Sequence, residues 1–145
     1  MPPDPDQDGA GPATGLRVCF VVPRYGPGVI GGAETAARLF AEHLVAGLGW
    51  PVEVLTGCAE DFATWDEVYP AGESTVNGVR VVRLPAERGR EPSFHPFSAA
   101  LLADPRRASP ADAERWVDLQ GPFAPALVDA ACAAGADVVV FYPYL

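Results

Sequence analysis

The residues best placed to do chemistry lie in a stretch rich in glycine and proline, residues 23–32, between an apolar run and a helical pattern. The first backbone N–H groups of a helix have no partners within it, and glycine lets a ligand approach the backbone closely. We therefore expect Gly31 and Gly32 to form an anion-binding helix start. Arg24 and Tyr25 share the loop and could bind phosphate or sugar hydroxyls. A surface arginine and a packing tyrosine are the alternative interpretation.

The same stretch matches the spacing of the dinucleotide pattern G-x-G-x-x-G through Gly26, Gly28 and Gly31. In that pattern the first glycine follows its strand almost directly, whereas three residues intervene here. The pattern also needs an acidic residue at the end of the second strand. The second predicted strand instead carries Glu53 in its middle, and Glu60 comes past its end. A dinucleotide-binding oxidoreductase is therefore an alternative rather than the leading interpretation.

Two further side chains could reach a binding cleft beside this loop. Arg83 ends a predicted strand and could point into the cleft, although a solvated or ion-paired arginine is the simpler interpretation. His95 lies in a predicted loop and could reach the same place. No motif supplies either of them with a second titratable partner, so no acid–base pair follows and the catalytic residues stay unknown. Tryptophan rings could stack on sugars or simply pack, and the chain has Trp50, Trp65 and Trp116.

Composition excludes several function classes for this chain of 145 residues. Its 19 acidic and 10 basic residues give a formal charge of -9, which disfavours nucleic acid as a partner. Because every basic residue is arginine, the chain offers neither a P-loop lysine nor a Schiff-base lysine. The cysteines are Cys19, Cys58 and Cys132, too far apart in the chain to suggest a disulfide framework or a zinc site. We expect no metal, and we expect Cys19 and Cys132 to be buried thiols.

Strand and helix patterns alternate along the chain. The predicted strands cover residues 16–22, 51–56, 79–84 and 137–142, and the predicted helices cover residues 33–48, 97–103, 110–120 and 124–134. Residues 57–75 are predicted to be irregular, and residues 79–84 are either a hairpin partner or a further strand of the same sheet. This order predicts an α/β fold with an open, mostly parallel Rossmann-like sheet and helices on both faces. Ligands of such sheets bind outside the carboxyl ends of the strands.

The N-terminal residues 1–15 place Asp4, Asp6 and Asp8 among prolines and glycines. This composition predicts a disordered acidic tail, and it lacks the basic and apolar regions of a signal peptide. No apolar stretch reaches the roughly 18 residues that span a bilayer. We therefore expect a soluble, cytoplasmic protein with one domain over residues 16–145, and a peripheral membrane contact stays open.

Three segments resemble the N-terminal domain of glycosyltransferase family 4, which has the GT-B fold. Gly31-Gly32-Ala33-Glu34, after a strand ending in Val-Val-Pro and before an amphipathic helix, resembles the start of these enzymes. Residues 76–85 resemble their turn and strand that end in Arg-x-Pro, and residues 137–140 are similar to the strand before a later active-site loop. In this order the segments extend over most of residues 17–145.

The resemblance implies a two-domain enzyme that transfers a sugar from a nucleotide-sugar to a carbohydrate, lipid or small-molecule acceptor, with retention and without cofactor or metal. Residues 16–145 would then be an incomplete acceptor-side domain, inactive without a C-terminal donor-binding domain that is absent here. Gly31 and Gly32 would face the interdomain cleft, near the donor diphosphate or the acceptor, and Arg83 and His95 would be possible residues of the acceptor side. Backbone N–H groups there would stabilise the charge that grows on the leaving group. A non-catalytic anion- or nucleotide-binding module is the remaining alternative.

Overall fold

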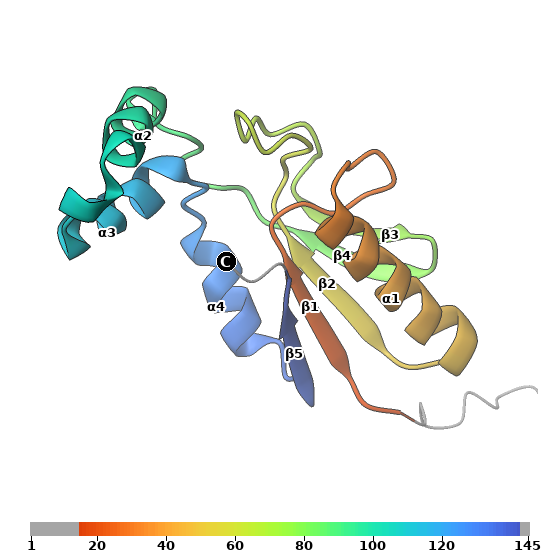
Figure 1. Ribbon diagram of the computed structural model, residues 1–145. Helices are drawn as coiled ribbons and strands as arrows, with labels where there is room; N and C mark the ends of the chain where they lie inside the picture. The colour runs from red at the N-terminus through yellow and green to blue at the C-terminus, as the bar shows by residue number, and fades with distance from the viewer. Residues whose placement is uncertain (1–14, 143–145) are drawn as a thin grey trace, which may run out of the picture.

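The computed structural model describes residues 15–142, so the predicted acidic tail lies, except for Gly15, outside the described residues. The strands are β1 (Val18–Val22), β2 (Val52–Thr56), β3 (Gly72–Val76), β4 (Val79–Arg83) and β5 (Val138–Phe141), and the α-helices are α1 (Gly32–Leu48), α2 (Phe94–Ala103), α3 (Pro110–Gln120) and α4 (Pro125–Ala133). The strands form one sheet in the order β3-β4-β2-β1-β5, with β3 antiparallel to β4 and the other pairs parallel (Figure 1). The predicted open, mostly parallel α/β sheet is confirmed.

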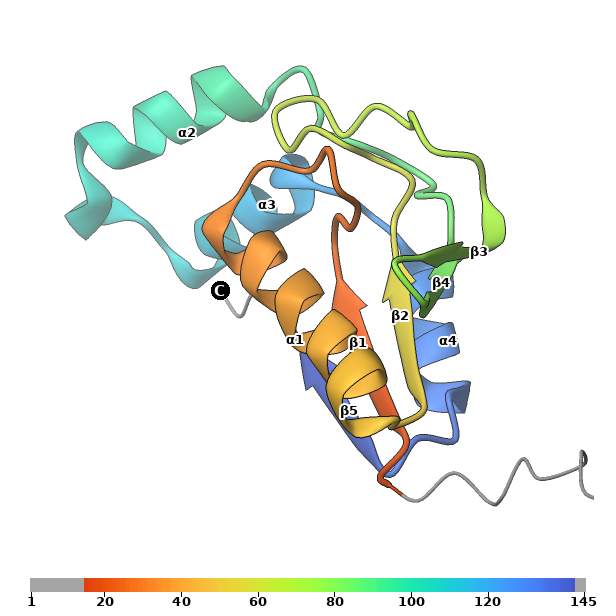
Figure 2. The same cartoon turned by 90° about the vertical axis from the view of Figure 1, so that its right-hand side faces the viewer.

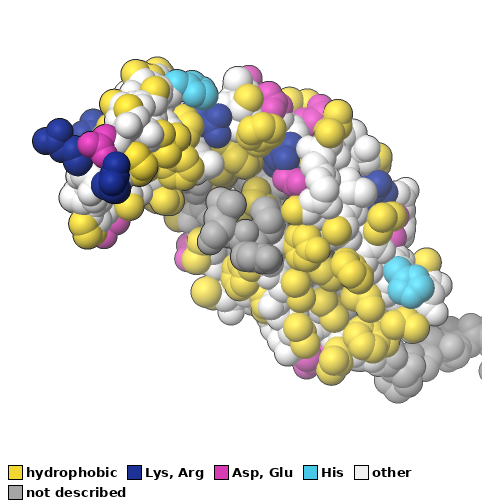
Figure 3. All heavy atoms as spheres, viewed as in Figure 1, with side chains coloured by type: hydrophobic (Ala, Val, Ile, Leu, Met, Phe, Trp, Pro, Cys, Tyr) yellow, Lys and Arg dark blue, Asp and Glu magenta, His cyan; other side chains and the backbone are white. Residues whose placement is uncertain are grey.

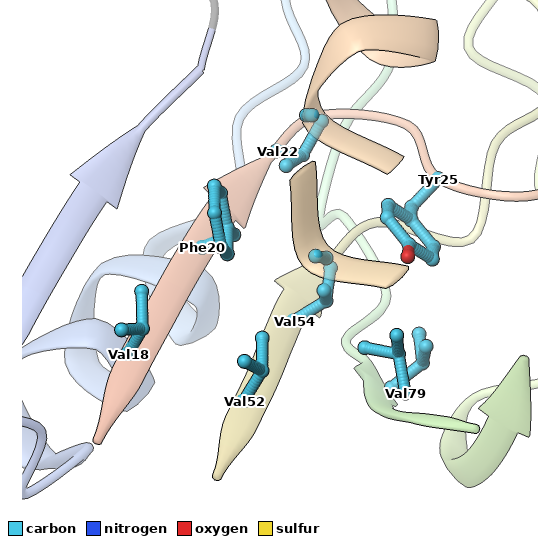
Figure 4. Close-up of a cluster of buried hydrophobic side chains, with 10 residues drawn as sticks. Val18, Phe20, Val22, Tyr25, Val52, Val54 and Val79 are labelled. Atoms are coloured by element: carbon cyan, nitrogen blue, oxygen red, sulfur yellow. The ribbon is translucent and has the colours of Figure 1, made fainter. Parts of the chain in front are cut away.

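Helices cover both faces of the sheet, as predicted, because side chains alternate between the two faces along each strand. In β1, Val18, Phe20 and Val22 join an apolar cluster with α1 (Figure 4). Cys19 and Val21 join a second cluster with α4. Figure 2 shows α1 and α4 on opposite sides of the strands. The continuous apolar sequence of β1 is thus explained by burial on both faces.

The helices α2 and α3 pack against each other instead of on the sheet (Figure 1). The rings of Phe94 and Trp116 lie 5.3 Å apart, and the Trp116 indole Nε1 donates a hydrogen bond of 2.9 Å to the Ser98 hydroxyl. At the start of α3, Ser109 and Asp112 form a capping box, with each side chain bonded to the other residue's backbone N–H. The predicted helix over residues 110–120 is confirmed.

The strand β3 lies inside the segment that the sequence predicted to be irregular, so that prediction was wrong for residues 72–75. Its sequence, Gly-Glu-Ser-Thr-Val, is polar and mostly exposed, and therefore lacks the apolar alternation of a half-buried strand. Asn77 and Gly78 form the predicted turn, with positive φ values of 48° and 84°. Both interpretations of the next strand hold, because β4 pairs with β3 as a hairpin and with β2 as a parallel neighbour.

Two local predictions were also wrong. Helix α2 begins at Phe94 rather than at residue 97, because Pro96 falls in the first turn, where its missing N–H removes no hydrogen bond. His95 is therefore a helix residue and not a loop residue. Cys132 is exposed, since only part of α4 faces the sheet, whereas Cys19 and Cys58 are buried free thiols.

The two edges of the sheet differ in character. β3 is polar along its length, whereas β5 is apolar, with Val138, Val139 and Phe141 exposed. Helix α1 also carries exposed Phe40 and Leu48, and Figure 3 shows hydrophobic side chains gathered along the α1 side of the molecule. Within residues 15–142, no helix has the length and apolar character needed to cross a membrane.

Candidate functional site

The loops that follow β1, β2 and β4 meet at the carboxyl edge of the sheet, because these strands run in parallel. They comprise residues 23–31, 57–71 and 84–93 (Figure 1). This edge brings together Arg24, Tyr25, Gly31, Gly32 and Arg83, which the sequence singled out. It is also the edge at which sheets of this class bind their ligands.

Arg24 is a buried ion-pair partner rather than a surface arginine. Its guanidinium lies 2.5 Å from the Glu34 carboxylate, and the two side chains are only 6% and 11% exposed. The same guanidinium donates to the backbone oxygens of Glu60, at 2.9 Å, and of Ile30, at 3.4 Å. Arg24 therefore ties its own loop to the first turn of α1 and to the loop after β2.

The glycines of the loop make room for the protein's own polar side chains. A Cβ at Gly26 would lie 3.0 Å from the Tyr69 hydroxyl oxygen, and a Cβ at Gly28 would collide with the Glu60 carboxylate. Tyr69 also donates a hydrogen bond of 3.3 Å to Glu60. Sequence reasoning missed Tyr69 altogether and noticed Glu60 only as an acid past the strand, because no spacing pattern links them to the loop.

The two glycines at the start of α1, Gly31 and Gly32, differ in the space around them. A Cβ at Gly31 would collide with the Glu34 carboxylate, whereas a Cβ at Gly32 would have nothing within 4 Å. No side chain caps this helix start with a hydrogen bond. The Glu34 carboxylate therefore occupies the space beside Gly31, whereas the space beside Gly32 is open.

We predict that Gly31→Ala destabilises the protein and Gly32→Ala does not. At Gly31 the new methyl group pushes Glu34 away from Arg24, an overpacking that costs about 1–3 kcal/mol. At Gly32 it enters open space at a helical position, where alanine is favoured over glycine. Urea unfolding of the two variants checks this, and equal stabilities would show that the Glu34 side chain moves aside freely.

Tyr25 belongs to the core. Its side chain is 0% exposed, and it packs in the α1-side cluster, where its hydroxyl has no hydrogen-bond partner (Figure 4). Burial, with a smaller contribution from the charge of Glu42, raises the pKa of Tyr25 to about 12. The packing interpretation of this residue is the one that its surroundings support, and only its backbone oxygen faces the loops.

The stability of the protein should therefore fall at high pH through Tyr25. Because the folded-state pKa lies above the ordinary value of 10.0, the stabilisation is complete below pH 10 and is lost as the pH rises towards 12. The loss amounts to about 3 kcal/mol for two pH units. Tyr25→Phe should remove this part of the alkaline loss without destabilising the protein at pH 7, as urea titrations at pH 8 to 11.5 would show. An identical alkaline loss in the variant contradicts the assignment.

Arg83 is a buried cation held by neutral groups. The residue is 5% exposed, and its guanidinium donates to the backbone oxygens of Tyr25, at 2.8 Å, and Gly57, at 3.4 Å. It also lies over the Tyr69 ring, 4.1 Å from the centroid. No acidic side chain of residues 15–142 forms a salt bridge with it, and burial lowers the pKa of its guanidinium. The simpler interpretation, a solvated or ion-paired arginine, was wrong for this position, because the strand end points it under the loops.

His95 lies apart from this cluster. It is an exposed residue in the first turn of α2, and its ring packs edge-on against Phe94 at 5.3 Å. Because α2 packs on α3, the structure does not bring His95 together with Arg24, Tyr25 or Arg83. In the described part of the chain, no group of three or more His, Cys, Asp or Glu side chains is arranged to hold a metal ion.

A cavity of about 480 Å³ opens beside the glycine loop, and we call it the acidic hollow. Its lining includes Arg24, Glu60, Asp61, Phe62, Thr64 and Asp66. Carboxylates and a threonine hydroxyl accept hydrogen bonds from ligand hydroxyl groups, and the Phe62 ring offers an apolar face. This combination suits a ligand rich in hydroxyl groups better than a free anion.

Comparisons with protein-family models, with curated proteins and with solved structures found no match to this chain.

Proposed function

We propose that the chain is the acceptor-side domain of a retaining glycosyltransferase that uses a nucleotide-sugar donor. The observation that carries the proposal is the hydrogen bond of 2.8 Å from the Arg83 guanidinium to the Tyr25 carbonyl. It joins the strand that ends in Arg-x-Pro to the loop before Gly-Gly-Ala-Glu. Two segments that resemble family 4 independently in sequence are thus parts of one cluster at the sheet edge.

In this proposal the acidic hollow receives the acceptor. Its carboxylates accept hydrogen bonds from the acceptor hydroxyls, and the Phe62 ring packs on an apolar sugar face. The donor diphosphate approaches α1 from the open Gly32 side, where backbone N–H groups stabilise the charge that grows on the leaving group. Catalytic residues remain unassigned, and neither a metal nor an organic cofactor is part of the proposal.

The donor nucleotide is held, in this proposal, by a second domain that the 145 residues do not include. The chain alone then binds acceptor without transferring sugar. The reaction takes place in the cytoplasm, with a peripheral membrane contact if the acceptor is a lipid.

A dinucleotide-binding function has one observation in its favour. Glu60 lies beside Gly28, so the acid that the second strand lacks in sequence approaches the glycine loop in space. In this position, however, the Glu60 carboxylate occupies the space beside Gly28 through which a pyrophosphate would approach the backbone. The Glu34 carboxylate occupies the corresponding space beside Gly31. We therefore place this function second.

The experiment is to express the complete gene product that contains this chain, and the chain alone, and to assay both. Each is given UDP-glucose, UDP-N-acetylglucosamine or GDP-mannose with a panel of glycosides, and NMR reports the anomeric configuration of products. We expect transfer with retention by the complete product only. Efficient transfer by the 145-residue chain would overturn the two-domain proposal. Binding of NADH without transfer would support the dinucleotide function instead.

A further inference from the structure

A second cavity, of about 510 Å³, lies on the other side of the loop after β2, and we call it the apolar hollow. Its lining includes Pro23, Cys58, Trp65, Phe123, Leu127 and Val128. It opens between the strand ends and the start of α4, so it borders the same sheet edge as the acidic hollow. The volume lies within the range of about 300–1,000 Å³ that is typical of small-molecule sites.

The loop after β2 separates the two hollows. Thr64, Asp66 and Val68 line the acidic hollow, whereas Trp65 and Glu67 line the apolar hollow. The two ends of this loop are held together. Ala59 and Glu67 form a β-bridge, and the backbone N–H groups of residues 68 and 69 donate hydrogen bonds of 2.9 and 2.8 Å to the Cys58 oxygen. One short segment therefore presents polar groups to one side and an aromatic ring to the other.

The opposite wall of the apolar hollow is also fixed. Phe123 and Arg88 form an antiparallel β-bridge, and the Phe123 N–H donates to the Arg88 oxygen at 2.8 Å. The Arg88 guanidinium lies over the Phe123 ring and forms a salt bridge of 2.7 Å with Asp118. This wall is thus held by backbone and charged contacts that lie outside the hollow.

Trp65 has a strained backbone at the rim of this hollow. Its φ is 62°, in the left-handed region that bulky residues rarely occupy. Its indole Nε1 is buried and has no hydrogen-bond partner. Backbone strain of this kind clusters at ligand sites, where the surrounding structure maintains it. The strained backbone therefore holds the Trp65 ring at the rim of the hollow, where an apolar group can pack against it.

We propose that the apolar hollow binds the apolar part of an amphiphilic acceptor whose hydroxyl-bearing part occupies the acidic hollow. Adjacent residues, Pro23 and Arg24, line the apolar and the acidic hollow respectively, so the hollows lie on either side of the same loops, and one molecule would reach both by passing over the loop after β2. Val128, 62% exposed, and Phe123 leave apolar surface in water that an alkyl chain or a ring would cover. This inference rests on the proposed function and narrows its acceptor to molecules with both a polar and an apolar part.

The test measures binding of n-octyl β-D-glucoside, below its micelle concentration, and of methyl β-D-glucoside to the 145-residue chain. The indole N–H signals of the three tryptophans in ¹H–¹⁵N NMR report which ring is affected. We expect the octyl glucoside to shift the Trp65 signal and to bind at least about 10-fold more tightly than the methyl glucoside, because an octyl chain adds apolar area to bury.

Two matched variants locate the site. Val128→Asp should weaken octyl glucoside binding about 10-fold or more, whereas Leu102→Asp, at a 64% exposed position on α2, should leave it unchanged. Equal binding of the two glucosides, or equal effects of the two variants, overturns the inference. It is also overturned if octyl glucoside shifts Trp65 in the chain alone but not in the complete gene product, because the remainder of the protein then covers the hollow.

The outcomes also separate this inference from the proposed function. If the complete gene product binds octyl glucoside at Trp65 but transfers no sugar, the amphiphile site is supported and the proposed glycosyltransferase function is contradicted. If it transfers sugar to purely polar acceptors and does not bind octyl glucoside, the proposed function is supported and the amphiphile site is contradicted. Co-sedimentation with phosphatidylcholine vesicles, lost in Val128→Asp, would identify a membrane lipid rather than a soluble glycoside as the source of the apolar group.

Discussion

Replacing Arg24 by Met should lower the free energy of unfolding by about 3–5 kcal/mol. The variant leaves the Glu34 carboxylate buried, with its side chain 11% exposed, beside a group that no longer carries a charge. It also removes the donors to the Glu60 and Ile30 carbonyls. Urea unfolding followed by circular dichroism measures the loss.

Two variants give this prediction its controls. The double replacement of Arg24 and Glu34 by Met should recover most of the lost stability, because a buried ion pair exchanged for apolar groups is often close to neutral. Arg38→Met breaks a more exposed pair with Glu42 on the same helix and should cost about 0.5 kcal/mol. Similar losses for Arg24→Met and Arg38→Met would show that the Arg24 pair contributes no more than a surface pair.

Arg83→Met should lower kcat/KM of the complete enzyme by about 100-fold, if the chain functions as proposed. The guanidinium holds the carbonyls of Tyr25 and Gly57, and so fixes the glycine loop against the loop after β2. A displacement of about 1 Å at such a site costs on the order of 10²-fold in rate. Since Arg83 acts through the loop, it is a positioning residue, and steady-state kinetics should show the loss mainly in kcat.

Arg80 provides the matched control for Arg83. It lies on the same strand but pairs with Glu53 and Glu73 at the surface, so Arg80→Met should leave kcat/KM unchanged. Arg83→Lys keeps the charge with a different donor geometry and should recover part of the rate. If Arg83→Met loses no more kcat/KM than Arg80→Met, the loop is not held through this guanidinium in the way proposed.

The elements that position the site could largely be predicted, because their sequences agree with their surroundings. β1 is apolar throughout since both of its faces are covered, and Ser109 with Asp112 identifies the start of α3 from spacing alone. β3 could not be predicted in this way. Its polar residues gain their strand conformation from pairing with β4, and only the turn at Asn77 and Gly78 indicated in the sequence that a hairpin partner precedes β4.

The orientations and contacts of the side chains at the site were much less predictable. Arg24 and Tyr25 are adjacent in one loop, yet one forms a buried ion pair and the other packs in the core. Which way each points depends on the path of the loop, and that path depends on partners as distant in sequence as Glu60 and Arg83. Residue type and position therefore located the cluster without revealing that its glycines accommodate the chain's own carboxylates.

In the 145-residue chain taken on its own, the unlike edges of the sheet limit how copies can associate. Within the described residues, β5 offers apolar side chains along an edge that pairs on one side only, with β1, while Glu73, Ser74 and Thr75 make the β3 edge polar. Head-to-tail stacking would have to join these two unlike edges, which disfavours filaments. Two copies that meet β5 against β5 about a two-fold axis would each cover their apolar edge at once. Association through the sheet would then end at a closed dimer.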